Sequence, residues 1–335
     1  MSPIKISVCI TTRNRAKFIG EALDSIISQA NDEVEIVIVD GASTDNTKEV
    51  VESYQKKSKN LVYHREAENH GVDRDMAKTL QLARGEYCWL FSDDDTFKPG
   101  AFKRMLKEIE SGCEIYLCNI TSCDHEMRPI RERYWLDKKT NDRTFALHNK
   151  KELIEYCNLA NSIGALFSYW SAVVVKREAW LKTGFLDEFD GSAYAMAATL
   201  LSFLNRQCRL KYIRDSLVLW RSDNESFQHA GGLVKRFLLD FDGYMRLADK
   251  YLLANDKSRE AFLTVMTREH PWYTIVNVTS QINNAEQWRS FREKMLKFGY
   301  SPSMAAICYA LGRYKKLISL GVTIKRKLVR AGFLR

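Results

Sequence analysis

The sequence predicts an α/β protein with a mostly parallel sheet and a C-terminal helical extension. Between residues 5 and 120, strand-like and helix-like segments alternate four times, which is typical of a parallel sheet with helical connections. After residue 225 the strand-like segments give way to helical patterns. These observations predict an α/β domain at residues 1–225 and a helical extension at residues 226–335.

Five strands are expected in the first part of the domain. Helices should separate them, because apolar residues such as Leu23, Ile26 and Ile27 recur at helical spacing. The runs rich in apolar and β-branched residues that predict the strands are 5–11, 34–40, 61–64, 87–91 and 114–120.

The pattern becomes less regular after residue 123. Residues 124–149 are polar and charged, so we expect a long loop there, close to the functional site. Strands are expected at 165–176 and 210–221, and helices at 192–203 and 233–253.

Polar residues end three of the predicted strands. Thr11 ends the first strand, Asp40 ends the second, and Asp93 follows the fourth. Ligands of open α/β sheets bind beyond the carboxyl ends of the strands, so these residues should line one crevice. The sequence contains neither Gly-x-Gly-x-x-Gly nor a Walker-type loop, so the two common nucleotide-binding fingerprints are absent.

Three consecutive carboxylates, Asp93, Asp94 and Asp95, follow the apolar strand 87–91. Adjacent like charges repel, so a positive group should lie among them. Oxygen ligands at a strand end suit Mg²⁺ or Mn²⁺, which take part of their coordination from substrate phosphates. The alternative is a solvated acidic turn before the helix that begins at Ala101.

The positive charge is concentrated at the C-terminus. The net charge of the chain is +9, and residues 303–335 contain eight basic residues and no acid, which leaves +1 for the rest. This asymmetry predicts binding to an anionic surface. We expect a membrane rather than nucleic acid, because few aromatic residues accompany the basic ones for base stacking. The alternative is a basic helix that packs on the body of the protein.

The eight cysteines are scattered singly and suggest neither a disulfide framework nor a zinc site. Residues 1–12 contain no long apolar segment of a secretory signal, and no apolar run is long enough to span a bilayer. We therefore expect a protein of the reducing cytoplasm.

Four ordered motifs in the first hundred residues resemble the GT-A glycosyltransferases of family 2. The motifs are Thr-Thr-Arg-Asn after the first strand, Val-Asp-Gly-Ala-Ser-Thr-Asp-Asn-Thr after the second, Gly71-x-x-Arg74, and Gly85-Glu86-Tyr87 leading to the three aspartates. The segments 162–169 and 221–227 are similar to the O-antigen abequosyltransferases. This resemblance implies the nucleotide-diphospho-sugar transferase fold, which is Rossmann-like.

The resemblance also implies an activity. Such enzymes move a 3,6-dideoxyhexose, here abequose, from a CDP-sugar to a mannose-containing lipid-linked O-antigen oligosaccharide. The location implied is peripheral, on the cytoplasmic face of the bacterial inner membrane. The alternative is a GT-A transferase of another sugar, such as a UDP- or GDP-hexose, in surface polysaccharide synthesis. A non-catalytic nucleotide-sugar binding module is a further alternative.

The resemblance assigns roles to individual residues. Asp94 would bind Mg²⁺ or Mn²⁺ directly, Asp93 would hold the ribose or a metal-bound water, and Asp95 would support the metal shell. The nucleotide would contact Thr11, Arg13, Asp40 and Arg74, while Arg221 and Asp223 would contact donor or acceptor. Four of these residues also have an ordinary structural interpretation. Asp40 would begin a turn, and Thr11 would cap the helix that follows. Arg74 would form a surface ion pair with Asp73 or Asp75, and Arg221 would pair with Asp223.

The sequence departs from the family pattern at two places. Ser92 stands where the family usually has an acid. The Glu-Asp pair that usually supplies the general base is missing after Gly184-Phe185, where Asp187 and Asp190 are the nearest carboxylates. Either of them would serve as the base. In a retaining front-face reaction, the leaving phosphate would instead take the proton.

Overall fold

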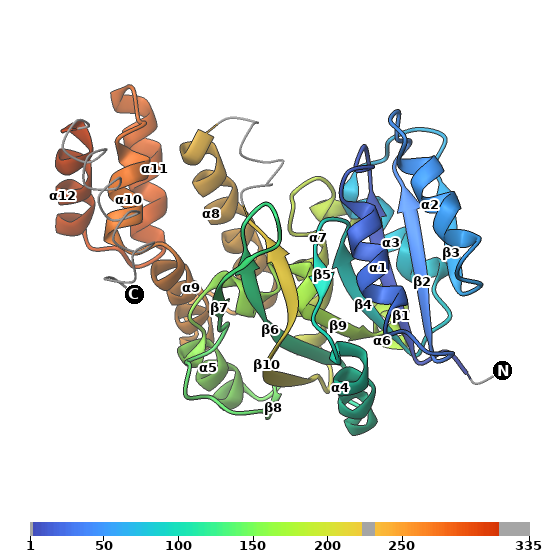
Figure 1. Cartoon of the computed structure of the whole chain (residues 1–335). Coiled ribbons are helices and arrows are strands. Elements are labelled where there is room, and N and C mark those ends of the chain that lie inside the picture. Colours follow the sequence, from blue (N-terminus) through green and yellow to red (C-terminus); the bar gives the residue numbers. More distant parts are fainter. Residues whose placement is uncertain (1–2, 223–231, 315–335) are drawn as a thin grey trace. The chain divides into compact units, whose positions relative to one another are not determined.

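The computed structural model describes residues 3–222 and 232–314 (Figure 1). The chain divides into two compact units, residues 1–224 with 250–252, and residues 225–249 with 253–335. Asp223 lies outside the described residues, as does most of the basic C-terminal segment.

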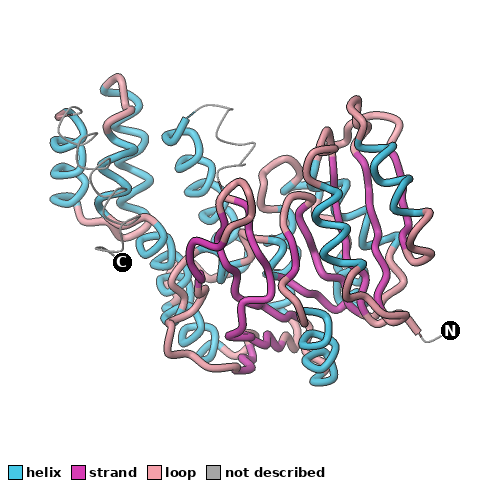
Figure 2. Tube along the Cα trace, in the orientation of Figure 1, coloured by secondary structure: helices cyan, strands magenta, loops and turns pink. Residues whose placement is uncertain are grey.

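The first unit is built on a mixed sheet in which six strands share one direction. Strand β1 pairs in parallel with β2 and β4, and β2 pairs in parallel with β3. Strands β6 and β10 form a second parallel pair, and β9 joins β4 to β6 by running antiparallel to both. These strands lie side by side in Figure 2. Their bounds are β1 Ile6–Thr12, β2 Val34–Asp40, β3 Leu61–Arg65, β4 Tyr87–Ser92, β6 Ile115–Cys123, β9 Val173–Lys176 and β10 Arg209–Arg221.

The expected loop at residues 124–149 contains two strands, so that prediction was wrong in part. β7 (Pro129–Arg133) pairs with β6, and β8 (Arg143–Ala146) pairs with β10, both antiparallel. β7 is almost entirely exposed, so it has no buried face to produce an apolar alternation in the sequence. The short β5 (Thr96–Phe97) also pairs with β10.

The strand expected at 165–176 is mostly not a strand. The strand covers only Val173–Lys176, and two short 3₁₀ helices, Ile163–Leu166 and Trp170–Ala172, precede it. Phe167 adopts a left-handed backbone with φ of 67°, which ends the first of them. The side chains are apolar because the turns are buried, and apolarity alone does not separate such turns from a strand.

Helices connect the strands of the first unit and pack against the sheet (Figure 2). The expected helix at 192–203 is shorter, because residues 190–194 form a turn in which Gly191 and Ala193 have positive φ. The bounds are α1 Ile19–Ile27, α2 Thr47–Gln55, α3 Val72–Leu82, α4 Ala101–Glu108, α5 Lys150–Leu159, α6 Arg177–Thr183 and α7 Ala195–Ser202.

An aromatic cluster fixes the end of β4. Phe91 stacks on Phe97 with ring centroids 4.0 Å apart, and Trp89 and Phe102 pack on the same ring. All four side chains are buried. The acidic segment between Phe91 and Phe97 is therefore held at both ends by core packing.

The second unit is helical, and its core is aromatic. Phe237 and Phe241 of the first helix pack against Phe291, and Phe241 also packs against Phe298. In the described part of the chain no helix is long and apolar enough to cross a bilayer. The helices are α8 Gly232–Tyr251, α9 Lys257–Glu269, α10 Trp272–Thr279, α11 Ala285–Lys297 and α12 Pro302–Arg313.

The backbone at Gly85, just before β4, lies very close to the backbone of β1 at Ser7. A Cβ atom there would lie 2.6 Å from Ser7 Oγ and 2.7 Å from the Ser7 backbone nitrogen. The Gly85 N–H donates to Ser7 Oγ, which in turn donates to the buried carboxylate of Glu35. No side chain fits between these backbones, so the position requires glycine.

We predict that Gly85→Ala lowers the free energy of unfolding by about 1–3 kcal/mol, because the backbone of β1 must shift to admit a methyl group. Chemical denaturation measures this. Gly20→Ala is the matched control, since the nearest atom to its new Cβ, Tyr54 Oη, is 3.4 Å away. This helical position should become more stable by about 0.5–1 kcal/mol. Equal stability of Gly85→Ala and the parent protein would contradict the packing argument.

Candidate active site

The predicted polar residues meet at one edge of the sheet. Thr12 lies opposite Asp40 in the β1–β2 register, and Thr11 lies opposite Ser92 in the β1–β4 register. Arg221 ends β10, which shares the direction of these strands through β9 and β6. In Figure 1, the arrowheads of β2 and β10 point to the same edge.

Asp95 is the anchor of the acidic segment. Its side chain is fully buried and accepts hydrogen bonds from Ser171 Oγ at 2.6 Å, from Tyr169 Oη and from the backbone N–H of Arg221 at 3.2 Å. Burial, followed by the charge of Asp94, raises the pKa of Asp95 to about 7. With three protein donors on its oxygens, Asp95 is arranged to support the segment from behind.

Arg221 holds the same segment from the other side. Its guanidinium donates to the carbonyl of Asp94 at 3.1 Å and to the carbonyl of His125. It also pairs with the carboxylate of Glu21 at 2.6 Å, and the residue is only 3% exposed. The structure shows a buried support of the acidic turn, and a contact of Arg221 with donor or acceptor stays a prediction.

Asp93 and Asp94 face a cation of the protein itself. Arg15 Nε lies 3.5 Å from Asp93 Oδ1, and Arg15 Nη2 lies 3.5 Å from Asp94 Oδ2. Ser92 Oγ donates to Asp94 Oδ1 at 2.5 Å. Burial and the charge of Asp94 raise the pKa of Asp93 to about 7, and Arg15 opposes that rise. Sequence reasoning called for a positive group here without identifying Arg15, which follows β1 by three residues.

The acidic pair fits a divalent ion. Its ligands would be carboxylate oxygens, which Mg²⁺ and Mn²⁺ prefer, and both carboxylates already face a positive group. Within the described residues, no three His, Cys, Asp or Glu side chains form a complete metal site. Asp94 and Asp93 would therefore hold an ion together with water and substrate oxygens, while Asp95 would act through the segment.

The turns after β1 and β2 brace each other beside this pair. Asn14 and Ala42 have φ values of 56° and 58°, which are uncommon for residues with a side chain. The backbone N–H of Asn14 donates to Ser43 Oγ, and Asn14 Oδ1 accepts from the N–H of Thr44. Left-handed residues of this kind collect at functional sites, where surrounding bonds hold the strain.

Asp40 is completely buried at the base of these turns. Its Oδ1 accepts from the Ser43 N–H at 2.7 Å, and its Oδ2 accepts from Tyr63 Oη at 2.7 Å. Asp40 therefore begins and stabilises the turn after β2, as the alternative interpretation from sequence had it. A direct contact between Asp40 and the nucleotide stays a prediction.

Next to Asp40, Gly41 lies between Asp75 and Arg13. A Cβ on Gly41 would meet Asp75 Oδ2 at 2.5 Å and Arg13 Cδ at 3.6 Å. Burial, then the charge of Glu66, raises the pKa of Asp75 to about 6. Sequence reasoning considered Asp75 only as a surface partner of Arg74, yet its side chain is largely buried beside the turn.

Arg74 is joined to both candidate bases. Its Nε lies 2.6 Å from Asp190 Oδ2, and its Nη2 lies 3.0 Å from Asp187 Oδ1. The neighbouring Asp73 accepts from the Gly191 N–H at 3.0 Å, so α3 fixes the 187–193 turn twice. These longer-range pairs replace the surface ion pair with Asp73 or Asp75 that was the alternative interpretation of Arg74, and its contact with the nucleotide stays a prediction.

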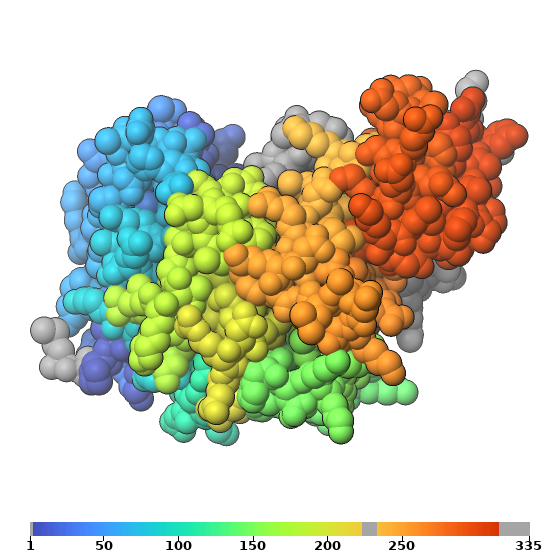
Figure 3. Space-filling view, turned by 180° about the vertical axis from the view of Figure 1, so that it is seen from behind, coloured from blue at the N-terminus to red at the C-terminus, as the bar shows by residue number. Residues whose placement is uncertain are grey.

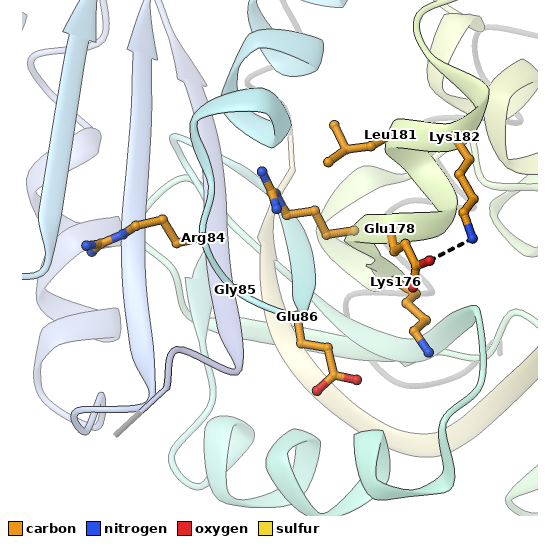
Figure 4. A pocket seen from close by; sticks show the side chains of 8 residues that line it. Arg84, Gly85, Glu86, Lys176, Glu178, Leu181 and Lys182 are labelled. Atoms are coloured by element: carbon orange, nitrogen blue, oxygen red, sulfur yellow. Dashed lines mark ion pairs between the residues drawn. The ribbon is translucent and has the colours of Figure 1, made fainter. Parts of the chain in front are cut away.

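Two hollows lie on the first unit. One, of about 340 Å³, is lined by Arg74 and Asp75 together with Glu66, His70, Phe185 and neighbours in α3. The other, of about 520 Å³, lies at the amino end of β4, on the opposite edge of the sheet from the acidic segment (Figure 4). Its side chains include Arg84, Glu86 and the Lys182–Glu178 ion pair. Only the first adjoins predicted site residues.

We predict that Tyr169→Phe lowers the free energy of unfolding by about 1.5–3 kcal/mol, because it removes a donor to the buried Asp95 carboxylate. Thermal and urea denaturation measure this. Tyr134→Phe is the matched control, since Tyr134 Oη donates to the exposed Glu132 and its loss should change stability by less than about 0.5 kcal/mol. Equal effects of the two substitutions would show that Asp95 does not anchor the segment.

Comparison with known proteins agrees with this geometry. The family model described as "Glycosyl transferase family 2" matches residues 7–170. Abequosyltransferase RfbV of Salmonella typhimurium is 32% identical over 314 residues, which is 92% of this chain and 93% of that protein. Putative glycosyltransferase EpsH of Bacillus subtilis is 29% identical over 34% of this chain and 33% of its own length.

Solved structures share the fold. S. aureus TarS in complex with UDP-GlcNAc superposes with a TM-score of 0.62 at 18% identity, over 88% of this chain and 80% of that one. Mannosyltransferase PcManGT from Pyrobaculum calidifontis, in complex with GDP-Man and Mn²⁺, superposes with a TM-score of 0.55 at 16% identity. This superposition covers 95% of this chain and 89% of that one. The predicted GT-A fold is confirmed, and the chain belongs to the family 2 glycosyltransferases.

Proposed function

We propose that this enzyme transfers a 3,6-dideoxyhexose, abequose, from a CDP-sugar to a mannose-containing lipid-linked O-antigen oligosaccharide. The observation that carries the catalytic part is the pair Asp93 and Asp94 at the carboxyl end of β4, which both face the guanidinium of Arg15. The full-length similarity to an abequosyltransferase supports the choice of sugar.

The proposed mechanism assigns the acidic pair to the donor diphosphate. A Mg²⁺ or Mn²⁺ ion held by Asp94 and Asp93 would act as a Lewis acid on the departing diphosphate. Asp95, bonded to Tyr169, Ser171 and the Arg221 N–H, keeps the two carboxylates in position. Thr11 and Arg13 border the nucleotide on the β1 side, next to the turn fixed by Asp40.

We infer that an aromatic cluster beside Asp95 suits a sugar that lacks hydroxyl groups. The ring of Tyr169 lies 5.7 Å from that of Trp135 and 5.8 Å from that of Trp220. A dideoxyhexose replaces two polar groups by apolar ones, so burial against aromatic carbon is favourable for it. Of the neighbouring aromatic residues in sequence, Phe167 is buried and Trp170 is partly exposed.

The proton of the acceptor hydroxyl must pass either to a base of the enzyme or to the leaving phosphate. Asp190 and Asp187 remain the candidate bases, and Arg74 positions both on the turn before α7. The alternative is a retaining reaction in which the leaving phosphate takes the proton. The Arg74 pairing supports the first route, because it fixes two carboxylates where the family usually carries its base.

The acceptor would bring the enzyme to a membrane. Residues 303–335 contain eight basic residues and no acid. Each basic residue near an anionic surface contributes about 1 kcal/mol. We therefore infer reversible, salt-sensitive attachment to the cytoplasmic face of the bacterial inner membrane.

Asp94→Asn should reduce sugar transfer more than tenfold, because the loss of a main contact to the ion costs several kcal/mol in the transition state. Transfer from radiolabelled donor measures this, with circular dichroism to check the fold. Asp32→Asn, at an exposed loop position, is the control and should retain full activity. Retention of more than about a tenth of the activity in Asp94→Asn would count against the role of Asp94.

CDP with Mn²⁺ should raise the melting temperature more than UDP or GDP with Mn²⁺ at the same concentration, because the nucleotide with the lowest Kd stabilises the native state most. A ligand at about 100 times its Kd contributes about 2.7 kcal/mol. A donor screen with CDP-, UDP- and GDP-sugars completes the test. Preference for a UDP- or GDP-hexose would overturn the sugar assignment and leave the family assignment intact. Binding without transfer from any donor would favour the non-catalytic alternative.

A further inference from the structure

Exposed apolar side chains are concentrated in the helical unit. In the described residues, ten large hydrophobic side chains are exposed, and six of them lie between residues 272 and 314. In Figure 3, α12, drawn in red, lies at the surface of this unit. We name this set the α10–α12 face, and its members are Trp272, Tyr273, Met304, Ile307, Leu311 and Tyr314.

The two helices that carry the α10–α12 face are packed closely. Thr279 Oγ1 donates to the carbonyl of Cys308 at 2.8 Å, and a Cβ on Gly312 would lie 2.9 Å from the Ser280 nitrogen. The Cys308 thiol lies 3.6 Å from the carbonyl of Trp272, so the start of α10 is beside the middle of α12.

Packing uses only one side of α12. Ala305, Cys308 and Gly312 are buried, while Met304, Ile307 and Leu311 are exposed. The exposed residues are three, four and seven positions apart, which places them in one stripe along the helix. The apolar stripe is therefore presented outward by a fixed helix pair.

Charge is almost absent from these two helices. α10 contains no charged residue, and α12 contains only Arg313. The helix between them in sequence, α11, carries Glu286, Glu293 and four basic residues. All charged residues after α11 are basic, from Arg313 to Arg335. A charge-poor, aromatic and aliphatic surface followed by basic residues is the composition of an interfacial membrane-binding element.

We propose that the α10–α12 face inserts into the surface of an anionic phospholipid bilayer. Trp272 and Tyr273 would lie at the headgroup level, where aromatic rings with a polar group are favoured. Ile307 and Leu311 would reach the acyl boundary, and the basic residues that follow would bind the headgroups. The inference rests on the proposed lipid-linked acceptor, and it adds the residues that make contact and an apolar, salt-resistant component to the attachment.

A second copy of the chain is a poorer occupant of the α10–α12 face. A two-fold interface pairs the same patch on both copies, and in each copy this patch is followed in sequence only by basic charged residues. Like charges facing each other disfavour such a contact. An anionic bilayer instead provides the complementary charge.

Two isoleucines of matched exposure allow a direct test. Ile307, in the α10–α12 face, is 58% exposed, and Ile130, in β7 of the first unit, is 59% exposed. The test measures flotation with vesicles of phosphatidylglycerol and phosphatidylethanolamine for three full-length proteins: the parent, Ile307→Asp and Ile130→Asp. Flotation is measured at low salt and in 1 M salt, where the screening length is about 3 Å. Melting temperature and CDP binding check that each variant is folded.

We expect Ile307→Asp to weaken vesicle partitioning at least tenfold at both salt concentrations, because one inserted isoleucine contributes about that much. Ile130→Asp should bind like the parent. Part of the parent binding should persist in 1 M salt, where purely electrostatic attachment is lost. Brominated phospholipid should also quench the fluorescence of the parent protein more than that of Trp272→Phe.

Equal partitioning of Ile307→Asp and the parent would overturn the inference. So would sedimentation showing that the parent dimerises and that Ile307→Asp only abolishes the dimer. In either case, intact CDP-sugar transfer to a detergent-solubilised acceptor would leave the proposed function standing. If the parent protein bound no nucleotide, the proposed function would instead be refuted. The vesicle measurements would then test the membrane inference alone.

Discussion

The buried carboxylate of Asp95 is the interaction on which the candidate active site depends. Its oxygens bind a tyrosine hydroxyl, a serine hydroxyl and a backbone N–H that come from two distant parts of the chain. A buried charge is stable only with such partners. The bonds connect the end of β4, the turn before β9 and the end of β10, so the requirement to satisfy one carboxylate assembles three segments around Asp93 and Asp94.

Charge balance explains the rest of the acidic segment. Two arginines contact the segment, but in different ways. Arg221 is buried and binds a backbone carbonyl of the segment together with Glu21, whereas Arg15 is partly exposed and lies 3.5 Å from each outer carboxylate. Arg221 therefore belongs to the scaffold. Arg15, with longer contacts, is the positive group that a metal ion would displace from the two carboxylates, because both cations compete for the same oxygens. An anionic diphosphate would attract the guanidinium of Arg15.

The helices beyond the catalytic unit contain a contrast of their own. Their interior is closed by aromatic packing around Phe241, yet the large apolar side chains of the α10–α12 face are left exposed. Exposed apolar surface has a free-energy cost in water, so a concentration of it marks a surface that meets a partner. For an enzyme proposed to act on a lipid-linked acceptor, that surface would hold the catalytic unit at the bilayer where its acceptor is found.

The sequence by itself determined the parallel α/β order, the edge at which the polar residues meet, and the need for a cation among the three aspartates. Those features follow from local patterns: apolar runs, helical spacing and adjacent like charges. Only the tertiary structure decided that β9 runs antiparallel between β4 and β6, that residues 124–149 contain two edge strands, and that Arg15 faces Asp93 and Asp94. It also decided that Arg74 binds Asp187 and Asp190, more than a hundred residues away. Pairing of exposed strands and of distant charges leaves no periodic trace in the chain, because it depends on which surfaces folding brings together.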